Sequence, residues 1–151
     1  MIRLIDWEVN KTSLEIGEKV WAIVDKWDYF NKDTLGKQFV RAADSMSLNI
    51  AEGYRRYFYK ENKNFNYYSR GSAFECTTCL RKALERNLIS SEENNVMRQL
   101  FEKYFRLING YIKSIGEKKE DHLVKEDAAI YKGRVSRLDN LLSNDLLTND
   151  Q

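Results

Sequence analysis

The chain has 151 residues, a formal net charge of +2 and no proline. Average usage would place about seven or eight prolines in a chain of this length, so their absence favours long uninterrupted helices over a structure rich in turns. The near-balanced charge excludes a polybasic tail, and the hydrophobic fraction of 42% argues against a disordered chain. Composition therefore predicts one helical, soluble domain with a core.

The first two helices are predicted from apolar residues at helical spacing. The first lies between residues 7 and 27, where the inward series is Ile16, Val20, Ile23 and Trp27. A break is expected at residues 31–33, and Asp33 is placed to cap the next helix. That helix has the inward series Leu35, Phe39, Ala42, Met46 and Ile50, and Gly53 ends the pattern.

The third and fourth helices follow an aromatic stretch at residues 54–59. The third has the inward series Phe65, Tyr68, Ser72, Cys76, Cys79 and Ala83, and it closes at Asn87. Ser90 and Glu93 then have the spacing of a capping box, with Ser90 as the N-cap. The fourth helix is the most regular, with the series Met97, Leu100, Tyr104, Leu107, Tyr111 and Ile115.

Four helices of about 22 to 27 residues with short links predict an all-α fold, an antiparallel up-down-up-down four-helix bundle over residues 1–119. Residues 120–151 form an acidic C-terminal extension, with four basic and seven acidic side chains. Apolar residues from Val124 to Leu146 also have helical spacing, which predicts an additional C-terminal helix, although Gly133 weakens it.

Targeting signals are not evident in the sequence. No apolar run approaches the roughly eighteen residues that suggest a membrane-spanning helix. Residues 1–6 lack the apolar core and the small-residue cleavage site of a signal peptide. We therefore expect a cytoplasmic protein with no membrane partner.

A basic and aromatic cluster occupies the middle of the chain. Residues 33–89 hold ten basic and six acidic side chains, a local excess of +4. Within this region Arg55, Arg56, Lys63 and Arg70 alternate with tyrosines, as suits nucleic acid: cations contact phosphates while rings stack on unpaired bases. The alternative is that the aromatic side chains lie in the core or in a subunit interface, where tyrosine and arginine are also enriched.

Two other motifs are better explained by structure than by chemistry. Cys76 and Cys79 have C-x-x-C spacing inside a predicted helix, but a zinc site needs about four ligands and the sole histidine is His122. We expect two buried thiols and no metal, cofactor or catalytic residue. A lone carboxylate such as Glu52 lacks the second acid or base that hydrolysis requires.

The segment from Phe39 to Gly53 (FVRAADSMSLNIAEG) resembles the signature of the four-helix bundle proteins encoded in intervening sequences of bacterial 23S ribosomal RNA genes. Residues 7–9, 70–75 and 107–112 fit the same family, so the resemblance covers about residues 5–117. It marks five signature residues with a structural role: Asn49, Glu52, Gly53, Gly71 and Glu75. We expect Glu52 to pair with Arg41, Arg55 or Arg70, and Gly53 to permit close helix approach.

The sequence departs from this family in two ways. Ser47 stands where relatives usually have proline, which predicts a less kinked second helix. Relatives also usually end near residue 120, so the resemblance does not extend to the acidic extension.

The resemblance implies a homopentamer, and the lack of a glycine-rich phosphate loop, a nucleophile elbow or a His-Glu metal motif predicts a non-enzymatic protein. With the local positive charge, the resemblance predicts binding of RNA or DNA through phosphate contacts from Arg41, Arg55, Arg56, Lys63 and Arg70. A related branch comprises the accessory variability proteins of diversity-generating retroelements, so a scaffold that binds a reverse transcriptase is the alternative. A third possibility is a structural bundle whose basic groups serve only subunit contacts.

Overall fold

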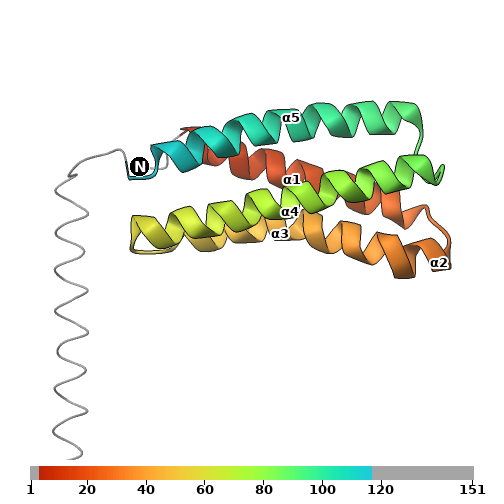
Figure 1. Cartoon of the computed structure of the whole chain (residues 1–151), viewed down its shortest axis with the longest axis horizontal. Helices are drawn as coiled ribbons and strands as arrows, with labels where there is room; N and C mark the ends of the chain where they lie inside the picture. Colours follow the sequence, from red (N-terminus) through yellow and green to blue (C-terminus); the bar gives the residue numbers. More distant parts are fainter. Residues whose placement is uncertain (1–3, 117–151) are drawn as a thin grey trace, which may run out of the picture. The chain divides into compact units, whose positions relative to one another are not determined.

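The structure, a computed structural model, describes residues 4–116. Four long helices form an antiparallel bundle (Figure 1): α1 (Leu4–Asp25), α3 (Lys37–Tyr54), α4 (Tyr59–Glu85) and α5 (Ser91–Ser114). A short helix, α2 (Tyr29–Asn31), and a π-helical segment, η1 (Lys32–Gly36), lead directly into α3. The predicted all-α four-helix bundle is confirmed. The helix predicted within residues 120–151 lies outside the described residues.

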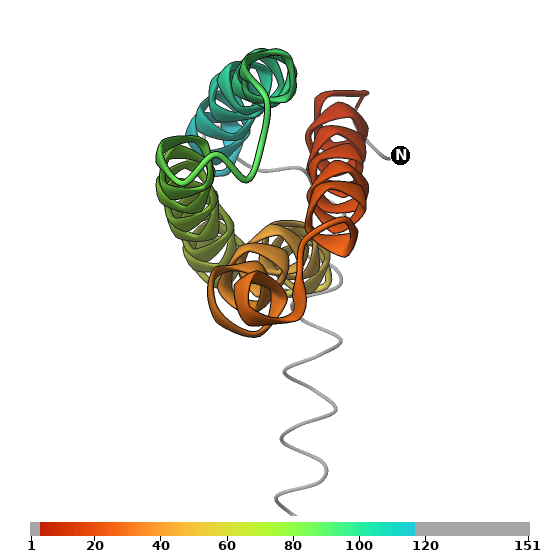
Figure 2. The ribbon, with the colours of Figure 1, turned by 90° about the vertical axis from the view of Figure 1, so that its right-hand side faces the viewer.

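The four helices surround one core. Each packs against two others, so that α1 and α4 both contact α3 and α5 (Figure 2). Within residues 4–116, no helix has the length and apolar character needed to cross a membrane. The innermost side chains come from all four helices, and burying each large one stabilises the fold by about 1.5–3 kcal/mol: Val9, Ile16, Val20, Phe39, Met46, Cys76, Met97, Tyr104 and Ile108.

The second helical segment begins earlier than the sequence pattern predicted. Asp28 is the N-cap, because its carboxylate accepts a hydrogen bond from the backbone N–H of Asn31 at 3.2 Å. The side-chain and backbone hydrogen bonds of Asn31 lower the pKa of Asp28. Asp33 lies in the first turn of η1, where it pairs with Lys37. The predicted break at residues 31–33 and the cap at Asp33 are therefore wrong, since α1 ends at Asp25 and the chain turns at residues 26–28.

The inward face of α4 also differs from its predicted series. Asn66 and Ser69 are fully buried, whereas Tyr68 is exposed. The Ser69 hydroxyl donates to the carbonyl oxygen of Met46 on α3 and lies 2.6 Å from the Tyr104 hydroxyl on α5. Small polar side chains fit the narrow space between the helices here. The hydrogen bonds of Ser69 offset the cost of its burial, whereas the buried Oδ1 atom of Asn66 has no hydrogen-bond partner among the described residues.

The links at one end of the bundle are well defined. The Ser90 hydroxyl accepts a hydrogen bond from the backbone N–H of Glu93 at 3.1 Å. In return, the Glu93 carboxylate accepts a hydrogen bond from the backbone N–H of Ser90 at 2.9 Å. This confirms the predicted capping box. Asn87, with φ of 55°, ends α4 in the left-handed region that asparagine tolerates. The Trp27 indole donates to the carbonyl oxygen of Leu88 at 3.0 Å, which ties the two links together.

Two helical glycines form a matched pair for mutation. A Cβ at Gly53 would lie 2.9 Å from the Cβ of Phe65 and 3.0 Å from the carbonyl oxygen of Asn62, whereas a Cβ at Gly71 would contact nothing within 4 Å. We expect Gly53→Ala to lower the free energy of unfolding by about 1–3 kcal/mol through overpacking. Gly71→Ala should instead raise it by up to about 1 kcal/mol through helix propensity. Urea denaturation of both variants checks this, and equal effects would contradict it.

Ser47 lies inside an uninterrupted α3, and its hydroxyl donates to the carbonyl oxygen of Asp44 at 3.2 Å. Ser47→Pro should lower the free energy of unfolding by about 3 kcal/mol or more, because proline removes a backbone donor and its ring strikes the preceding turn. Ser47→Ala is the control and should have little effect. An unchanged thermal midpoint for Ser47→Pro would mean that α3 accommodates the bend that the sequence resemblance implies.

Candidate nucleic-acid interface

The five predicted phosphate contacts do not form a single cluster. Arg55 and Arg56 lie in the turn between α3 and α4, and Lys63 lies one turn into α4. Arg41 is fourteen residues before Arg55, about 21 Å away along the helix axis. Arg70 lies farther along α4, on the side that faces α5. The structure thus brings Arg55, Arg56 and Lys63 to one end of the bundle and separates the other two.

Two of these arginines are held by contacts within the bundle. Arg56 pairs with Glu52, and its guanidinium lies 4.7 Å from the ring centre of Phe65. Arg70 donates to the side chain of Asn109 at 2.9 Å and stacks on Tyr67. The expected pairing of Glu52 with Arg41, Arg55 or Arg70 is therefore wrong, because Arg56 is one helical turn away on the same face.

Arg41 and Arg55 are the two arginines of the predicted set that are not held by another side chain of residues 4–116. Both are exposed, and neither forms an ion pair with a residue in the described part of the chain. An unpaired guanidinium can offer all of its donors to a phosphate. Lys63 is half-buried and also lacks an acidic partner among residues 4–116.

The aromatic side chains beside these cations are mostly exposed. They lie at the end of α3, in the α3–α4 turn and in the first turns of α4: Tyr54, Phe58, Tyr59, Tyr67 and Tyr68. The interpretation that they fill the core of the protomer is therefore wrong for these five. Exposed aromatic rings beside free cations can stack on nucleic-acid bases or contact a protein partner.

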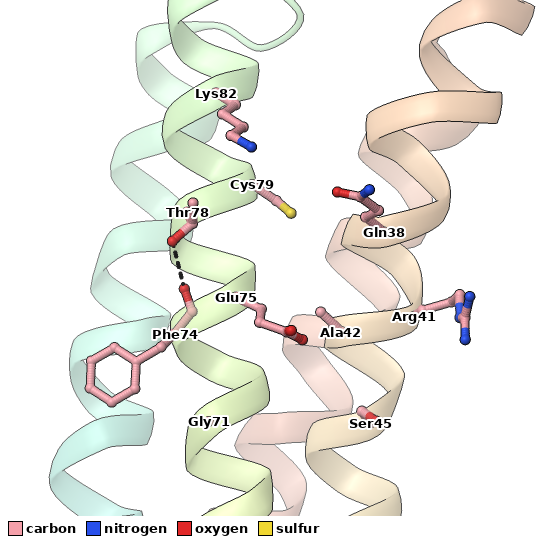
Figure 3. Close-up of a pocket in the computed structure, with 10 residues that line it drawn as sticks. All are labelled: Gln38, Arg41, Ala42, Ser45, Gly71, Phe74, Glu75, Thr78, Cys79 and Lys82. Atoms are coloured by element: carbon pink, nitrogen blue, oxygen red, sulfur yellow. Dashed lines mark hydrogen bonds between the residues drawn. The ribbon is translucent and has the colours of Figure 1, made fainter.

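A groove of about 590 Å³ lies between α3 and α4 (Figure 3). From α4, Glu75 and Lys82 extend toward α3, while Arg41 points outward from the opposite rim. Sequence reasoning missed Lys82 and the groove, although the four-three-four spacing of Gly71, Glu75, Thr78 and Lys82 could have indicated a shared face. Because one carboxylate lies beside two cations, the groove is a weaker anion site than the α3–α4 turn.

The signature residues have different environments. Gly53 lies where α3 and α4 approach closely, and the Asn49 side chain donates to the carbonyl oxygen of Ser45 at 2.8 Å. Glu52 holds Arg56. Gly71 and Glu75 are exposed and line the groove between α3 and α4. Packing within the protomer therefore accounts for Asn49 and Gly53, but not for Gly71 and Glu75.

The two cysteines face inward on α4, as predicted. Both are buried free thiols, and Cys79 lies at the bottom of the groove. Burial raises the pKa of both thiols, and so disfavours the reactive thiolate. Among the described residues, no group of three potential ligands is arranged to hold a metal ion.

Comparison with known proteins identifies the family. The sequence profile of the 23S rRNA-intervening sequence proteins matches residues 6–110. The chain belongs to the 23S rRNA-intervening sequence protein family. The family resemblance of the sequence is thereby confirmed.

Among solved structures, the chain is similar to a protein of unknown function from the S23 ribosomal protein family of Bacteroides thetaiotaomicron. The TM-score is 0.67 at 19% identity, and the alignment covers 74% of this chain and 100% of that one. At this identity the similarity shows a shared fold alone. No curated protein matches this member of the 23S rRNA-intervening sequence family.

The thiols provide a direct check of the C-x-x-C motif. Ellman's reagent should react slowly with the native protein, because both sulfur atoms are buried and their pKa values are raised. In denaturant both thiols should react at the rate of free cysteine. Rapid labelling of Cys76 in the native state would show instead that this part of α4 is accessible.

Proposed function

We propose that this family member is a non-enzymatic, cytoplasmic homo-oligomer that binds RNA or other nucleic acid at the α3–α4 end of the bundle. The observation that carries the proposal is the position of Arg55 and Lys63, neither with an acidic partner in the described residues, beside exposed Tyr54, Tyr59 and Tyr68. The family's link to ribosomal RNA genes makes structured RNA the first ligand to test.

The arrangement suits unpaired nucleotides better than a regular duplex. Cations at the turn would contact phosphates, and the exposed rings could stack on bases that are splayed out of a loop. Arg56, held against Phe65 by Glu52, has fewer free donors and would contribute less than Arg55. Arg41 is too far along α3 to contact the same few nucleotides, and it would engage a longer ligand together with Lys82.

A homo-oligomer, a pentamer by family resemblance, would strengthen such binding. A single protomer has a net charge of only +2, which attracts a polyanion weakly. Repeating the turn around a symmetry axis would place several copies of the same cations within reach of one RNA.

A protein partner such as a reverse transcriptase is the second candidate. The same exposed tyrosines and arginines favour it, because both residue types are enriched in protein interfaces. Tyr59→Ala and Tyr68→Ala would then abolish capture of the polymerase while the salt dependence of RNA binding stayed as in the wild type.

The proposal predicts salt-dependent binding to 23S ribosomal RNA fragments. The logarithm of the association constant should decrease linearly as the logarithm of the salt concentration increases. Arg55→Gln and Lys63→Gln should each reduce the slope by about one and weaken binding to all sequences alike. Arg86→Gln, at the opposite end of α4, is the matched control and should leave the slope unchanged.

Fluorescence anisotropy with labelled fragments measures these slopes. Absence of binding at low salt, or an association constant that does not change with the salt concentration, would overturn the nucleic-acid proposal. Equal effects of Arg86→Gln and Arg55→Gln would show general attraction by the whole surface rather than a site at the turn.

A further inference from the structure

One side of the bundle, between α1 and α3, exposes an apolar row. Trp7, Leu14 and Trp21 are 56%, 51% and 61% exposed and repeat every seven residues. This spacing aligns them along α1 at intervals of about 10 Å, as in the seam of a helix that packs on a partner. Isolated exposed apolar residues are ordinary, but three large ones in a row indicate an interaction surface.

Two apolar hollows accompany this row. Trp21 borders one of about 270 Å³ with Val24 and Val40, and Trp7 borders one of about 260 Å³ with Ile50 and Ala51. Arg41 also lines the first hollow, and Tyr54 and Arg55 also line the second, so this surface adjoins the proposed nucleic-acid site. The protruding tryptophan rings and the neighbouring hollows together form one surface, and side chains of another molecule can enter the hollows. We call it the α1–α3 edge.

A second apolar surface lies between α4 and α5, the α4–α5 edge. Phe74 is 58% exposed and packs against Phe105 with ring centres 4.8 Å apart. Farther along the same edge, Leu80, Leu84 and Phe101 line a hollow of about 380 Å³. Figure 3 shows Phe74 directed away from α3, on the side of α4 nearest α5.

The other two sides of the bundle are polar. The α1–α5 side carries the ion pairs Glu8–Lys103 and Lys26–Glu93, and the α3–α4 side carries the groove with Glu75. Because the helices are neighbours in the order α1, α3, α4, α5, the two apolar edges lie on opposite sides of the bundle (Figure 2).

We propose that the α4–α5 edge of one copy packs on the α1–α3 edge of the next copy. Contact between two different surfaces is heterologous, and a suitable rotation between copies closes it into a ring. This inference rests on the homo-oligomer of the proposed function and specifies the surfaces through which its copies meet.

The positions of the surfaces along the bundle agree with such a ring. The hydrogen bond from Trp27 to Leu88 places the end of α1 beside the end of α4. Trp21 lies six residues before Trp27, and Leu80 and Leu84 lie eight and four residues before Leu88. If the ring axis is parallel to the helices, Trp21 of one copy therefore faces the hollow at the α4–α5 edge of its neighbour.

Both edges carry mixed charge, because Lys32, Lys37 and Arg41 line a hollow of one and Glu102 lines the hollow of the other, but one acidic pair has a cationic counterpart. Burial and the neighbouring carboxylate of Glu18 raise the pKa of Asp44, so two acidic groups lie close together beside the α1–α3 edge. Neither forms an ion pair in the described part of the chain. Arg98 borders the hollow of the α4–α5 edge, is exposed, and likewise has no acidic partner within residues 4–116. An arginine from the neighbouring copy would neutralise the acidic pair.

A mixing experiment with two full-chain variants tests the proposal. Leu14→Asp damages the α1–α3 edge, and Phe74→Asp damages the α4–α5 edge and leaves the α1–α3 edge intact, although Phe74 also borders the groove between α3 and α4. Both side chains are more than half exposed, so the fold should persist, as circular dichroism can verify. By light scattering each variant alone should have the 17.9 kDa mass of one chain. An equimolar mixture should form a species of twice that mass, because each variant retains the edge that the other lacks.

Matched controls place the same aspartate on other sides of the bundle. Ala22→Asp on α1 and Gln38→Asp on α3 are also at exposed positions, and both should keep the mass of the wild type. If the two monomeric variants do not associate when mixed, the heterologous contact is refuted. If only Leu14→Asp dissociates the oligomer, the α1–α3 edge instead pairs with itself in a twofold dimer.

The remaining outcomes separate this inference from the proposed function. If neither variant changes the mass of an oligomeric wild type, the two edges are not the interface, although the homo-oligomer stands. A monomeric wild type overturns both the interface and the homo-oligomer. The salt slope of RNA binding then still decides the nucleic-acid proposal by itself.

Discussion

The close approach of α3 and α4 is the constraint on which the rest of the structure depends. At Gly53 the two helices are near enough to exclude even a methyl group, and two turns earlier on α3 the carbonyl oxygen of Met46 accepts a hydrogen bond from Ser69. Phe65 packs its Cβ against Gly53 in this seam, while the other aromatic residues in the first turns of α4 lie on the outside. The exposed tyrosines near Arg55 therefore lie outside this narrow part of the core.

Much of the fold follows from periodicity, because the first two predicted helices bury their whole apolar series and α5 buries all of its series except the half-buried Leu100 and Leu107. The capping box at Ser90 could be read directly, since it depends on two residues three positions apart. The start of the second helical segment could not, because Asp28 and Asp33 are both suitable caps and only the end of α1 at Asp25 decides between them. The inward face of α4 was misjudged at Tyr68 because hydrophobicity ranks tyrosine above the serine that actually fits.

The candidate site was predictable in residue type but not in arrangement. The sequence shows that Arg41, Arg56 and Arg70 are basic. It cannot show that Arg56 already pairs with Glu52 and that Arg70 already donates to Asn109. Arg41 is separated from the α3–α4 turn by its distance along α3. The packing of α3 against α4 places Lys82 in the same groove as Arg41. Such groupings depend on the relative rotation of α3 and α4, which the close approach at Gly53 fixes and which no local pattern encodes.

The three tryptophans occupy environments that optical spectroscopy can distinguish. Trp27 is buried, stacks against Phe39 and donates its indole N–H to Leu88, whereas Trp7 and Trp21 are open to solvent at the two ends of one helix. Emission from Trp27 should be shifted to the blue and protected from aqueous quenchers, while the other two rings account for the quenchable fraction of a single copy and become protected where copies pack on the α1–α3 edge. The chain therefore contains intrinsic probes that separate events at the surface from loosening of the core, and no external label is needed to follow either.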